Sequence, residues 1–367
     1  MNECFAVIAG GGTAGHVHPG LAVAKSLVEN GYPKESILYV GSDRGIERDL
    51  VPSEGFELVT LSGAGIPRRK PVAALKAVVL LMRGTAGAFR LLRERRPKVV
   101  LALGGFACFP CAVASLLLRI PVVIHEQNAV PGLANKIISR WARYSGVSYE
   151  RTMLRNALYT GNPVRKEILE ARKINPHQIR EKLEVPISNL LFVVTGGSLG
   201  AHKINLALSN AIPFINKGTD LTLYHIVGRR DWEEIGPLKE KLQQFIDYRP
   251  VEYEYDMPSV LRTADLVISR AGGSITAEIA ALSLPAVLIP LPNAPGDHQT
   301  ANARAISTSG SARILPDESC TGNNLANLIN ELTENLEELH RMRECAETNT
   351  QVNAAEKLAD LLKRAAL

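Results

Sequence analysis

The sequence predicts an α/β protein made of two Rossmann-like, doubly wound domains that face a cleft. Apolar runs that suit buried strands alternate with helical patterns along the first half of the chain, and the second half repeats this alternation. Each half opens with an apolar strand, a glycine-rich loop and a helix. Such alternation is typical of a parallel sheet with helices on both faces, and 367 residues suit two domains of this kind.

The first half opens with an apolar run at residues 5–9, which predicts a buried strand. A loop rich in glycine follows at residues 10–16 and leads into a helix expected at 19–30. Unpaired backbone N–H groups at a helix start attract anions, and glycines let a ligand approach the backbone closely. His16 adds a titratable imidazole where the loop enters the helix.

Four more strands and four more helices complete the first half. The strands are expected at 36–41, 57–61, 98–103 and 121–125, and the helices at 44–54, 72–95, 109–118 and 131–142. Two strands end in polar or glycine-containing loops, Gly104-Gly105-Phe106 and His125-Glu126-Gln127-Asn128. Ligands of doubly wound sheets bind at the carboxyl ends of strands, so both loops are candidate site segments.

The alternation of strand and helix patterns is interrupted near residues 159–165, and a polar connector that contains prolines follows at 173–186. The second half of the chain begins after this connector. A strand at 190–194, a glycine loop at 195–201 and a helix at 204–215 repeat the opening pattern. Further strands are expected at 221–227, 251–253, 265–268 and 286–289. Residues 269–278 form another glycine-containing loop that opens a helix, and the last stretch of the chain is helical by propensity.

Positive charge is concentrated in one segment. Residues 66–98 contain ten lysines and arginines and one acidic residue, whereas the whole chain has a net charge of only +5. The rest of the chain is therefore slightly acidic. This local excess predicts an anionic surface as a partner.

Composition excludes several classes of protein. Five scattered cysteines argue against a disulfide framework, and we interpret Cys108 and Cys111 as apolar residues at the start of a buried helix. No run of about 18 apolar residues appears, and the chain opens on a strand rather than a leader segment, which favours a reducing cytoplasm. His16 and His18 have no evident third partner, so no metal site is expected.

The glycine loops leave several nucleotide chemistries to weigh. Gly10, Gly12 and Gly15 satisfy the dinucleotide pattern, but the acidic residue that should follow the second strand, Asp43, comes late. This late position argues against a dehydrogenase that transfers hydride, but it does not exclude one. No G-x-x-x-x-G-K-[ST] loop is present, which argues against a Walker-type ATPase. Arg165 or helix N-termini could neutralise a diphosphate.

Five motifs, in this order, resemble the MurG family of N-acetylglucosaminyltransferases, which complete lipid II in peptidoglycan synthesis. They are residues 11–20 (GGTAGHVHPG), 125–128 (HEQN), 161–165 (GNPVR), 195–201 (TGGSLGA) and 278–281 (EIAA). The likeness covers residues 7 to about 305, and the motifs are specific only when taken together.

The resemblance implies a GT-B fold and an inverting, single-displacement transfer. N-acetylglucosamine would pass from UDP-N-acetylglucosamine to the C4 hydroxyl of lipid I, with no cofactor and no catalytic metal. Residues 1–164, completed by 345–367, would form the acceptor and membrane domain, and 165–344 the UDP-sugar domain. The resemblance implies a peripheral location at the anionic cytoplasmic face of the cell membrane. It also implies that other cell-wall synthesis proteins can be partners and that nucleic acid is not one.

The resemblance also implies a site, residue by residue. The donor set is Thr13, Ala14, Gly15, Asn128, Arg165, Ser198, Glu278 and Gln299. The acceptor set is Gly12, Gly104, Gly105, Phe106 and Glu126. His16 matches the family's proposed base, Asn128 and Gln299 would face sugar hydroxyls, Arg165 and Ser198 the diphosphate, and Glu278 the ribose diol. A neutral imidazole with a reference pKa of about 6.5 suits proton removal near neutral pH.

Three positions depart from the family pattern. Ala14 stands where a glycine is usual and could narrow the loop. Leu199 replaces a frequent glutamine, and Phe106 replaces a frequent tyrosine beside the acceptor, which removes a hydroxyl group.

Plainer interpretations remain open for single residues and for the whole chain. His16 could cap a helix, His125 and Glu126 could satisfy buried loop backbone, and Glu278 could be a first-turn helix charge. Arg165 could be an ordinary surface charge. The rival functions are a UDP-N-acetylglucosamine 2-epimerase, another GT-B lipid glycosyltransferase, and a non-enzymatic lipid-surface scaffold.

The basic segment predicts membrane contact. Its apolar run from residue 71 to 82 is broken by Lys76 and is too short to cross a bilayer, which needs about 20 residues. Leu75, Val79 and Met82 share one helical face. We expect these side chains to enter the cytoplasmic leaflet while flanking cations meet anionic head groups. The cations are Arg68, Arg69, Lys70 and Arg83.

Overall fold

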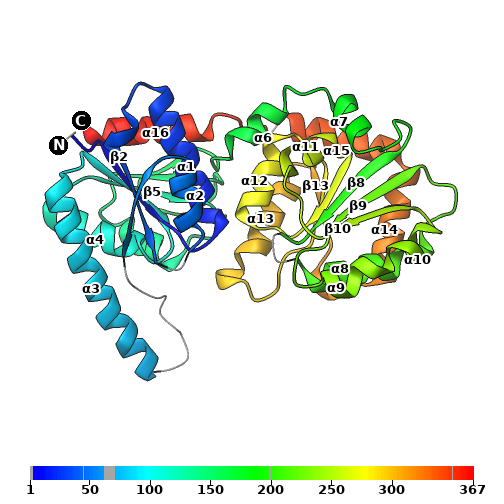
Figure 1. The fold of residues 1–367 in the computed structure, drawn as a ribbon, viewed down its shortest axis with the longest axis horizontal. Helices are drawn as coiled ribbons and strands as arrows, with labels where there is room; N and C mark the ends of the chain where they lie inside the picture. Colours follow the sequence, from blue (N-terminus) through cyan, green and yellow to red (C-terminus); the bar gives the residue numbers. More distant parts are fainter. Residues whose placement is uncertain (1–2, 44, 62–70, 198–199, 349) are drawn as a thin grey trace. The chain divides into compact units, whose positions relative to one another are not determined.

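The structure, a computed structural model, describes residues 3–43, 45–61, 71–197, 200–348 and 350–367, with side chains from residue 79 onward in the third range. It contains two compact units. Unit 1 comprises Met1–Arg165 and Val352–Leu367, and unit 2 comprises Lys166–Gln351. Each unit is an α/β domain with one wholly parallel sheet (Figure 1). The chain therefore leaves unit 1 after Arg165 and returns to it at Val352.

Unit 1 has a seven-stranded sheet in the order β3-β2-β1-β4-β5-β6-β7. The strands are β1 (Ala6–Gly10), β2 (Ile37–Ser42), β3 (Glu57–Leu61), β4 (Val99–Gly104), β5 (Val122–Glu126), β6 (Tyr144–Val147) and β7 (Ala157–Tyr159). Its helices are α1 (Ala14–Glu29), α2 (Glu47–Ser53), α3 (Pro71–Arg95), α4 (Cys108–Leu118), α5 (Leu133–Ile138) and α16 (Ala354–Ala366). Strand β1 is buried along its whole length, which explains its uninterrupted apolar sequence.

The two faces of this sheet are covered by different helices. On one face α1 and α16 pack together, and the core there includes Val17, Leu21, Leu27, Leu358 and Leu362. Burial of a leucine of this kind contributes about 1.5–3 kcal/mol, so the last helix of the chain is an integral part of unit 1.

The opposite face of the sheet carries α3 and α4, and its core includes Val7, Val40, Leu92 and Cys111. Cys108 and Cys111 are both free and buried at the start of α4. Burial raises the pKa of the Cys108 thiol to about 12, so this group is an uncharged apolar filler at neutral pH.

Unit 2 repeats the architecture with six strands in the order β10-β9-β8-β11-β12-β13. The strands are β8 (Leu190–Thr195), β9 (Leu221–Ile226), β10 (Asp247–Val251), β11 (Leu266–Ser269), β12 (Ala286–Leu288) and β13 (Ala312–Ile314). The helices are α6 (Lys166–Ala171), α7 (Pro176–Lys182), α8 (His202–Ala211), α9 (Trp232–Ile235), α10 (Lys239–Gln243), α11 (Met257–Thr263), α12 (Gly273–Ala281), α13 (His298–Ser307), α14 (Gly322–Glu334) and α15 (Leu336–Thr348). Short 3₁₀ turns lie at Lys34–Ser36 in unit 1 and, in unit 2, at Ile212–Phe214, Gly236–Leu238, Pro295–Asp297 and Asp317–Ser319.

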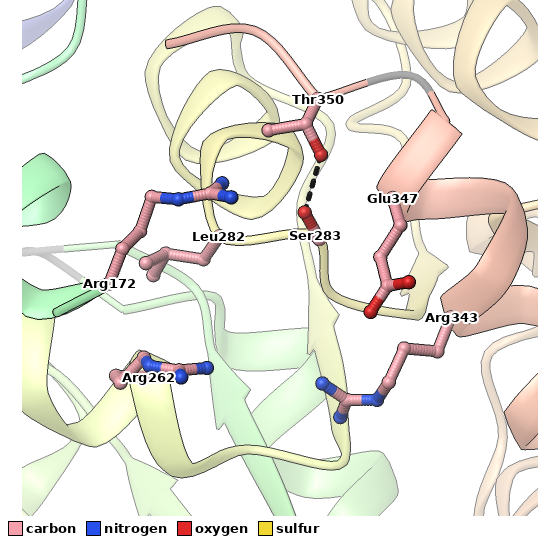
Figure 2. A pocket seen from close by; sticks show the side chains of 7 residues that line it. All are labelled: Arg172, Arg262, Leu282, Ser283, Arg343, Glu347 and Thr350. Carbon is pink, nitrogen blue, oxygen red and sulfur yellow. Dashed lines mark hydrogen bonds between the residues drawn. The ribbon is translucent and has the colours of Figure 1, made fainter. Parts of the chain in front are cut away.

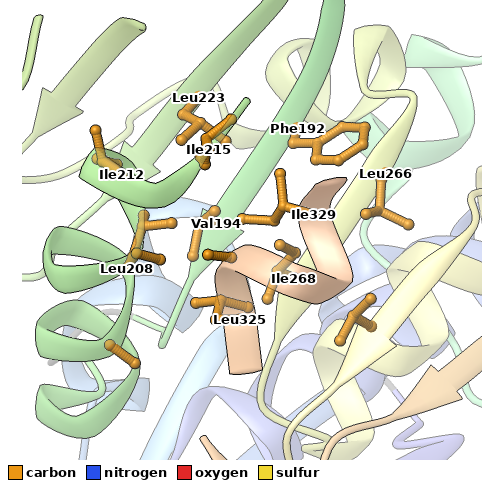
Figure 3. Close-up of a cluster of buried hydrophobic side chains, with 14 of the residues drawn as sticks. Phe192, Val194, Leu208, Ile212, Ile215, Leu223, Leu266, Ile268, Leu325 and Ile329 are labelled. Atoms are coloured by element: carbon orange, nitrogen blue, oxygen red, sulfur yellow. The ribbon is translucent and has the colours of Figure 1, made fainter. Parts of the chain in front are cut away.

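The core of unit 2 forms where α8 and α14 cover the centre of the sheet. Leu208 of α8 and Ile329 of α14 meet Val194 of β8 and Ile268 of β11 (Figure 3). All four side chains are fully buried. Because β8 and β11 are central strands, this cluster fixes the register of the strands whose carboxyl ends carry the loops of the unit.

The doubly wound α/β prediction is confirmed, and most predicted strands lie within one residue of their expected bounds. Two differences matter for the site. Helix α1 begins at Ala14 rather than at Pro19, so His16 lies in its first turn. Strand β10 occupies Asp247–Val251 rather than 251–253, because this edge strand alternates partly exposed and buried residues and has no apolar run. The short strands β6, β7 and β13 lack such a run too and were not anticipated.

A buried carboxylate holds the first glycine loop against the sheet. Glu47, the first residue of α2, is fully buried. Its Oε2 accepts the backbone N–H of Gly12 at 2.9 Å, and its Oε1 accepts the backbone N–H and the hydroxyl of Ser42, each at 2.8 Å. Charged acceptors make the stronger hydrogen bonds, so Glu47 joins the loop after β1 to the end of β2.

Three glycines make room for this carboxylate. A Cβ atom at Gly11, Gly41 or Gly45 would overlap the side chain of Glu47. Burial by itself raises the pKa of Glu47, but the hydrogen bonds from Gly12 and Ser42 outweigh burial and hold the pKa below its usual value of 4.5. The carboxylate is therefore charged at neutral pH.

We predict that Glu47→Gln lowers the free energy of unfolding by about 2–3 kcal/mol near pH 7, because an amide nitrogen would face donors that need an acceptor. A carboxyl group whose folded pKa is depressed stabilises the protein above its unfolded pKa, and this contribution is lost as the pH falls through the folded pKa. The difference between the two proteins should therefore shrink below pH 4.5. Chemical denaturation at both pH values measures it, and a difference that stays constant with pH would contradict this account.

Candidate active site

His16 lies in the first turn of α1, directly after the glycine loop. Its Nδ1 is 3.2 Å from the carbonyl oxygen of Gly11 and 3.3 Å from the hydroxyl of Thr13. A carbonyl oxygen only accepts, so the hydrogen bond to Gly11 places the ring proton on Nδ1. Nε2 then carries the lone pair, which is the form a general base needs.

The surroundings of His16 keep this imidazole neutral. Its partial burial lowers the pKa below the usual 6.5 and outweighs three opposing influences, the hydrogen bond to Gly11 and the negative charges of Glu126 and Glu47. The start of α1 acts in the same direction, because the positive end of a helix dipole disfavours an imidazolium. His16 can therefore accept a proton at neutral pH.

A second loop, after β4, closes around the same imidazole. Gly104 and Gly105 have φ values of +114° and +77°, which side chains rarely adopt. A Cβ atom at Gly104 would lie 2.7 Å from Nε2 of His16, and one at Gly105 would overlap the backbone of Gly11. The loops after β1 and β4 therefore approach to a distance that only glycine permits.

Phe106 follows these glycines and packs against the core beneath α3 and α4. A Cβ atom at Gly84 of α3 would lie 3.2 Å from its ring, so the ring sits beside that helix. The predicted acceptor contacts of Gly12, Gly104, Gly105 and Phe106 stay predictions. What the structure places together is His16 with the two glycines.

Glu126 organises the loop after β5. Its carboxylate, which is 3% exposed, accepts the backbone N–H of Asn128 at 3.1 Å and of Gly132 at 2.9 Å. It also accepts the side-chain amide of Asn135 at 2.8 Å. Both carboxylate oxygens are thus occupied within the loop, which makes Glu126 a residue that positions Asn128, while its predicted contact with the acceptor stays untested.

His125 connects this loop to the last segment of unit 1. The ring is buried, and its Nε2 is 2.9 Å from the carbonyl oxygen of Gly161. Burial lowers the pKa of His125 to about 4, so it is neutral and structural. Gln127 donates to the carbonyl of Leu103 at 2.8 Å. The ends of β4 and β5 and the segment that leads to Arg165 are thereby fixed to one another.

The glycine loop of unit 2 follows β8 as expected. Gly197 and Gly200 have φ values of +89° and +79°, and the N–H of Gly200 donates to the carbonyl of Gly197 at 2.9 Å. A Cβ atom at Gly200 would overlap the carbonyl of Val227. Ser198 and Leu199 lie outside the described residues. The loop is followed by α8, whose buried Asn205 donates to the same carbonyl of Val227 at 2.9 Å.

The third loop leads into α12, which carries Glu278. This side chain is only 8% exposed and lies beyond the first turn of α12, so it is not the first-turn helix charge that the sequence left open. Gln299, at the start of α13, accepts the backbone N–H of Leu291 at 2.9 Å, which fixes its orientation. Asn302 donates to the carbonyl of Ala271 at 3.0 Å and ties α13 to the loop before α12.

Two positioning residues escaped the sequence interpretation, Glu47 and Asn205. Each is a polar residue at the start of a helix, where acidic and amide side chains are ordinary, so residue type alone carries no signal. The glycines at positions 11, 41 and 45, which leave space for the side chain of Glu47, were the sequence feature that could have indicated its role. Among the residues that the structure describes, no three His, Cys, Asp or Glu side chains gather where one metal ion could bind them.

Comparisons with known proteins identify the family and the fold of the chain. The Glycosyltransferase family 28 N-terminal domain matches residues 6–146, and the Glycosyltransferase family 28 C-terminal domain matches residues 191–361. The crystal structure of MurG from Acinetobacter baumannii superposes with a TM-score of 0.80 at 29% identity and covers 98% of this chain and 99% of that one. The UDP-GlcNAc 2-epimerase from Neisseria meningitidis, at 15% identity, TM-score 0.70, and coverage of 98% and 99%, shares the fold alone.

Two curated relatives carry the name UDP-N-acetylglucosamine--N-acetylmuramyl-(pentapeptide) pyrophosphoryl-undecaprenol N-acetylglucosamine transferase. The protein from Carboxydothermus hydrogenoformans is 40% identical over 93% of this chain and 92% of its own length. The protein from Desulforamulus reducens is 35% identical over 98% and 97%. With both halves matched and relatives of this similarity along its whole length, the chain belongs to the MurG family of glycosyltransferases with the GT-B fold.

Proposed function

We propose that this protein transfers N-acetylglucosamine from UDP-N-acetylglucosamine to the C4 hydroxyl of the N-acetylmuramoyl pentapeptide carried by undecaprenyl diphosphate, which converts lipid I into lipid II. The observation that carries this proposal is the arrangement of His16, whose Nδ1 is held by Gly11 and whose Nε2 faces the glycines after β4. Membership in the MurG family supplies the substrates.

The chemistry needs one base and a stable leaving group. Nε2 of His16 takes the proton of the acceptor hydroxyl, and the hydroxyl oxygen attacks the anomeric carbon of the donor sugar. The bond from that carbon to the diphosphate oxygen breaks, and its electron pair leaves with UDP. Attack on the face opposite the leaving group inverts the anomeric configuration.

The donor contacts follow the family assignment. Glu278 would accept two hydrogen bonds from the ribose diol, and Arg165 with Ser198 would neutralise the diphosphate. Asn128 and Gln299 would bind the sugar hydroxyls, with Thr13, Ala14 and Gly15 lining the loop. Cationic and helix-terminal groups perform the neutralisation here, so the proposal involves no cofactor and no catalytic metal.

The acceptor is a lipid, and unit 1 offers an apolar surface for it. A cavity of about 540 Å³ between α3 and α4 is lined by Leu81, Met82, Phe89, Phe109 and Leu117. Met82 and Leu117 are 60% and 64% exposed, which is unusual for large apolar side chains. We infer that this surface contacts the cytoplasmic leaflet of the cell membrane peripherally, where other cell-wall synthesis proteins would be accessible to it.

Of the four cations expected beside this surface, the structure describes Arg83. Val79, 38% exposed, and Arg83, also exposed, lie on α3 near Met82. Arg68, Arg69 and Lys70 lie outside the described residues, and the side chain of Leu75 lies outside them as well. No helix in the described part of the chain is long and apolar enough to span a bilayer. We infer an attachment through surface contact and charge.

The decisive experiment incubates the protein with labelled UDP-N-acetylglucosamine and a soluble lipid I analogue. Transfer of the label to the analogue is the expected result. Epimerisation of the donor in the absence of acceptor would instead assign the epimerase function, and an inert protein would leave only a scaffold role.

Replacing His16 tests its role as base. His16→Ala should lower turnover about 10²–10⁴-fold while donor affinity stays unchanged. His18→Ala, on the same helix, is the matched control and should retain turnover. Because the pKa of His16 is depressed, turnover of the wild-type protein should persist as the pH falls through 6.5 and decline only below it. Near-normal turnover of His16→Ala at saturating acceptor would remove it from this role.

Replacing Glu278 tests the nucleotide contact. Glu278→Ala should weaken UDP binding by about 1.5–3 kcal/mol, the range for hydrogen bonds to charged groups, and should spare acceptor binding. Isothermal titration calorimetry measures both affinities. Glu240→Ala, an exposed carboxylate on α10, controls for the loss of negative charge. Equal UDP affinity in the two variants would show that Glu278 does not bind the nucleotide.

Removing the cations tests membrane attachment. The variant with Arg68, Arg69, Lys70 and Arg83 changed to Gln should sediment less with anionic vesicles, because each cation contributes about 1 kcal/mol near such a surface. Transfer to a soluble acceptor should persist. The control changes four exposed cations of unit 2 to Gln, Lys217, Lys239, Lys241 and Arg341. Equal sedimentation of both variants at low salt would refute the electrostatic attachment.

A further inference from the structure

A second cavity lies in unit 2, at the end of the sheet where the strands begin. The glycine loops lie at the opposite end, where the strands finish. It occupies about 410 Å³ where α11 leads into β11 and where α12 leads into β12. These strands begin here, whereas the donor loops follow strand ends, so the cavity is separate from the proposed active site. Its volume falls within the usual range for small-molecule pockets, about 300–1,000 Å³.

Three arginines from three separate elements converge on this cavity (Figure 2). Arg172 follows α6, Arg262 lies on α11, and Arg343 lies on α15. Among the lining residues only Glu347 is acidic, so the cavity has an excess of positive charge. The hydroxyls of Ser283 and Thr350, which hydrogen-bond to each other, line another side (Figure 2).

The three guanidinium groups differ in how well they are paired. Arg343 donates to the carbonyl of Ala264 at 2.9 Å and lies 3.8 Å from the carboxylate of Asp265. Arg172 donates to the carbonyl of Ala281. Arg262 has neither an ion pair nor a hydrogen bond with any described residue, and its Nε is buried without an acceptor. A buried donor of this kind is costly, so Arg262 needs an acceptor that the described chain does not supply.

The charges also act on one another. Burial lowers the pKa of Arg262, and the positive charges of Arg343 and Arg172 lower it further. Arginine stays protonated at neutral pH despite such shifts, so the mutual repulsion is present in the folded protein. An oxyanion in the cavity would relieve this repulsion and satisfy the donors of Arg262 at the same time.

We propose that this cavity binds a phosphate group, carried either by a soluble phosphate ester or by a lipid head group. Guanidinium groups match phosphate oxygens in charge and in hydrogen-bond geometry, and the cavity leaves room for more than the phosphate itself. Arg172 comes six residues after unit 2 begins, and Thr350 is the residue before its last, Gln351. An occupant would thus link the two segments through which the chain enters and leaves unit 2.

Calorimetric titration of the full chain with inorganic phosphate, in saturating UDP, tests this site independently of donor binding. The wild-type protein should bind one phosphate, and Arg262→Gln should weaken this binding about tenfold or more. Arg341→Gln, which removes an exposed arginine from the same helix as Arg343, should leave it unchanged. Glu347→Gln should strengthen it, a gain that misfolding cannot produce.

Competition identifies the source of the phosphate. Displacement of inorganic phosphate by glycerol phosphate alone assigns a soluble ester, and displacement by phosphatidylglycerol vesicles that depends on Arg262 assigns a lipid head group. The proposal is overturned if phosphate does not bind in the presence of UDP, or if Arg262→Gln and Arg341→Gln bind it equally well. It does not rest on the proposed transferase activity, so failure of either leaves the other standing.

Discussion

The close approach of two backbone segments determines the surroundings of His16 in unit 1. Gly105 meets the backbone of Gly11, and Gly104 faces the imidazole of His16, at distances that exclude any side chain. This contact exists because β1 and β4 are neighbours in the parallel sheet, and their register pairs Gly10 with Gly104. The imidazole of His16 is therefore confined by the backbone of two loops, and its Nδ1 lies within hydrogen-bond distance of the carbonyl oxygen of Gly11 and the hydroxyl of Thr13.

Buried carboxylates keep that geometry in place. Glu47 joins the first loop to β2, and Glu126 joins the loop after β5 to α5. Both negative charges raise the proton affinity of His16, yet burial of the ring dominates and the pKa is depressed. The balance leaves an imidazole that is neutral but more basic than burial alone would allow. The same carboxylates thus hold the loops in place and raise the proton affinity of the imidazole between them.

Much of this arrangement could be predicted from the sequence. Apolar runs such as residues 190–194 located the central strands, because strands buried on both faces contain no polar interruptions. Two edge strands could not be located in this way: β7 is wholly exposed, and β10 alternates buried and partly exposed residues. The glycines and His16 marked the loops at the ends of the central strands.

The positioning residues were beyond the reach of the sequence for a physical reason. Glu47 and Asn205 act through contacts with residues distant along the chain, such as Gly12 and Val227, and pairwise distance is not encoded in periodicity. The cavity with three arginines could not be predicted from the sequence for the same reason, because its cations come from positions 172, 262 and 343. Local pattern reveals elements and loops, whereas convergence of side chains from remote segments requires the fold.

The return of α16 to unit 1 has a consequence for synthesis of the chain on the ribosome. Leu358 and Leu362 complete the core beneath α1, yet they follow the whole of unit 2 along the chain and are translated after it. Domains generally fold as units during synthesis, the N-terminal one first. Here that order is reversed for the final step, because unit 2 is continuous and emerges whole, whereas unit 1 is completed only by α16, which follows unit 2 along the chain. Until α16 has been translated, the nascent N-terminal half must keep an apolar face uncovered, and ribosome-associated chaperones are the cellular factors suited to shield it.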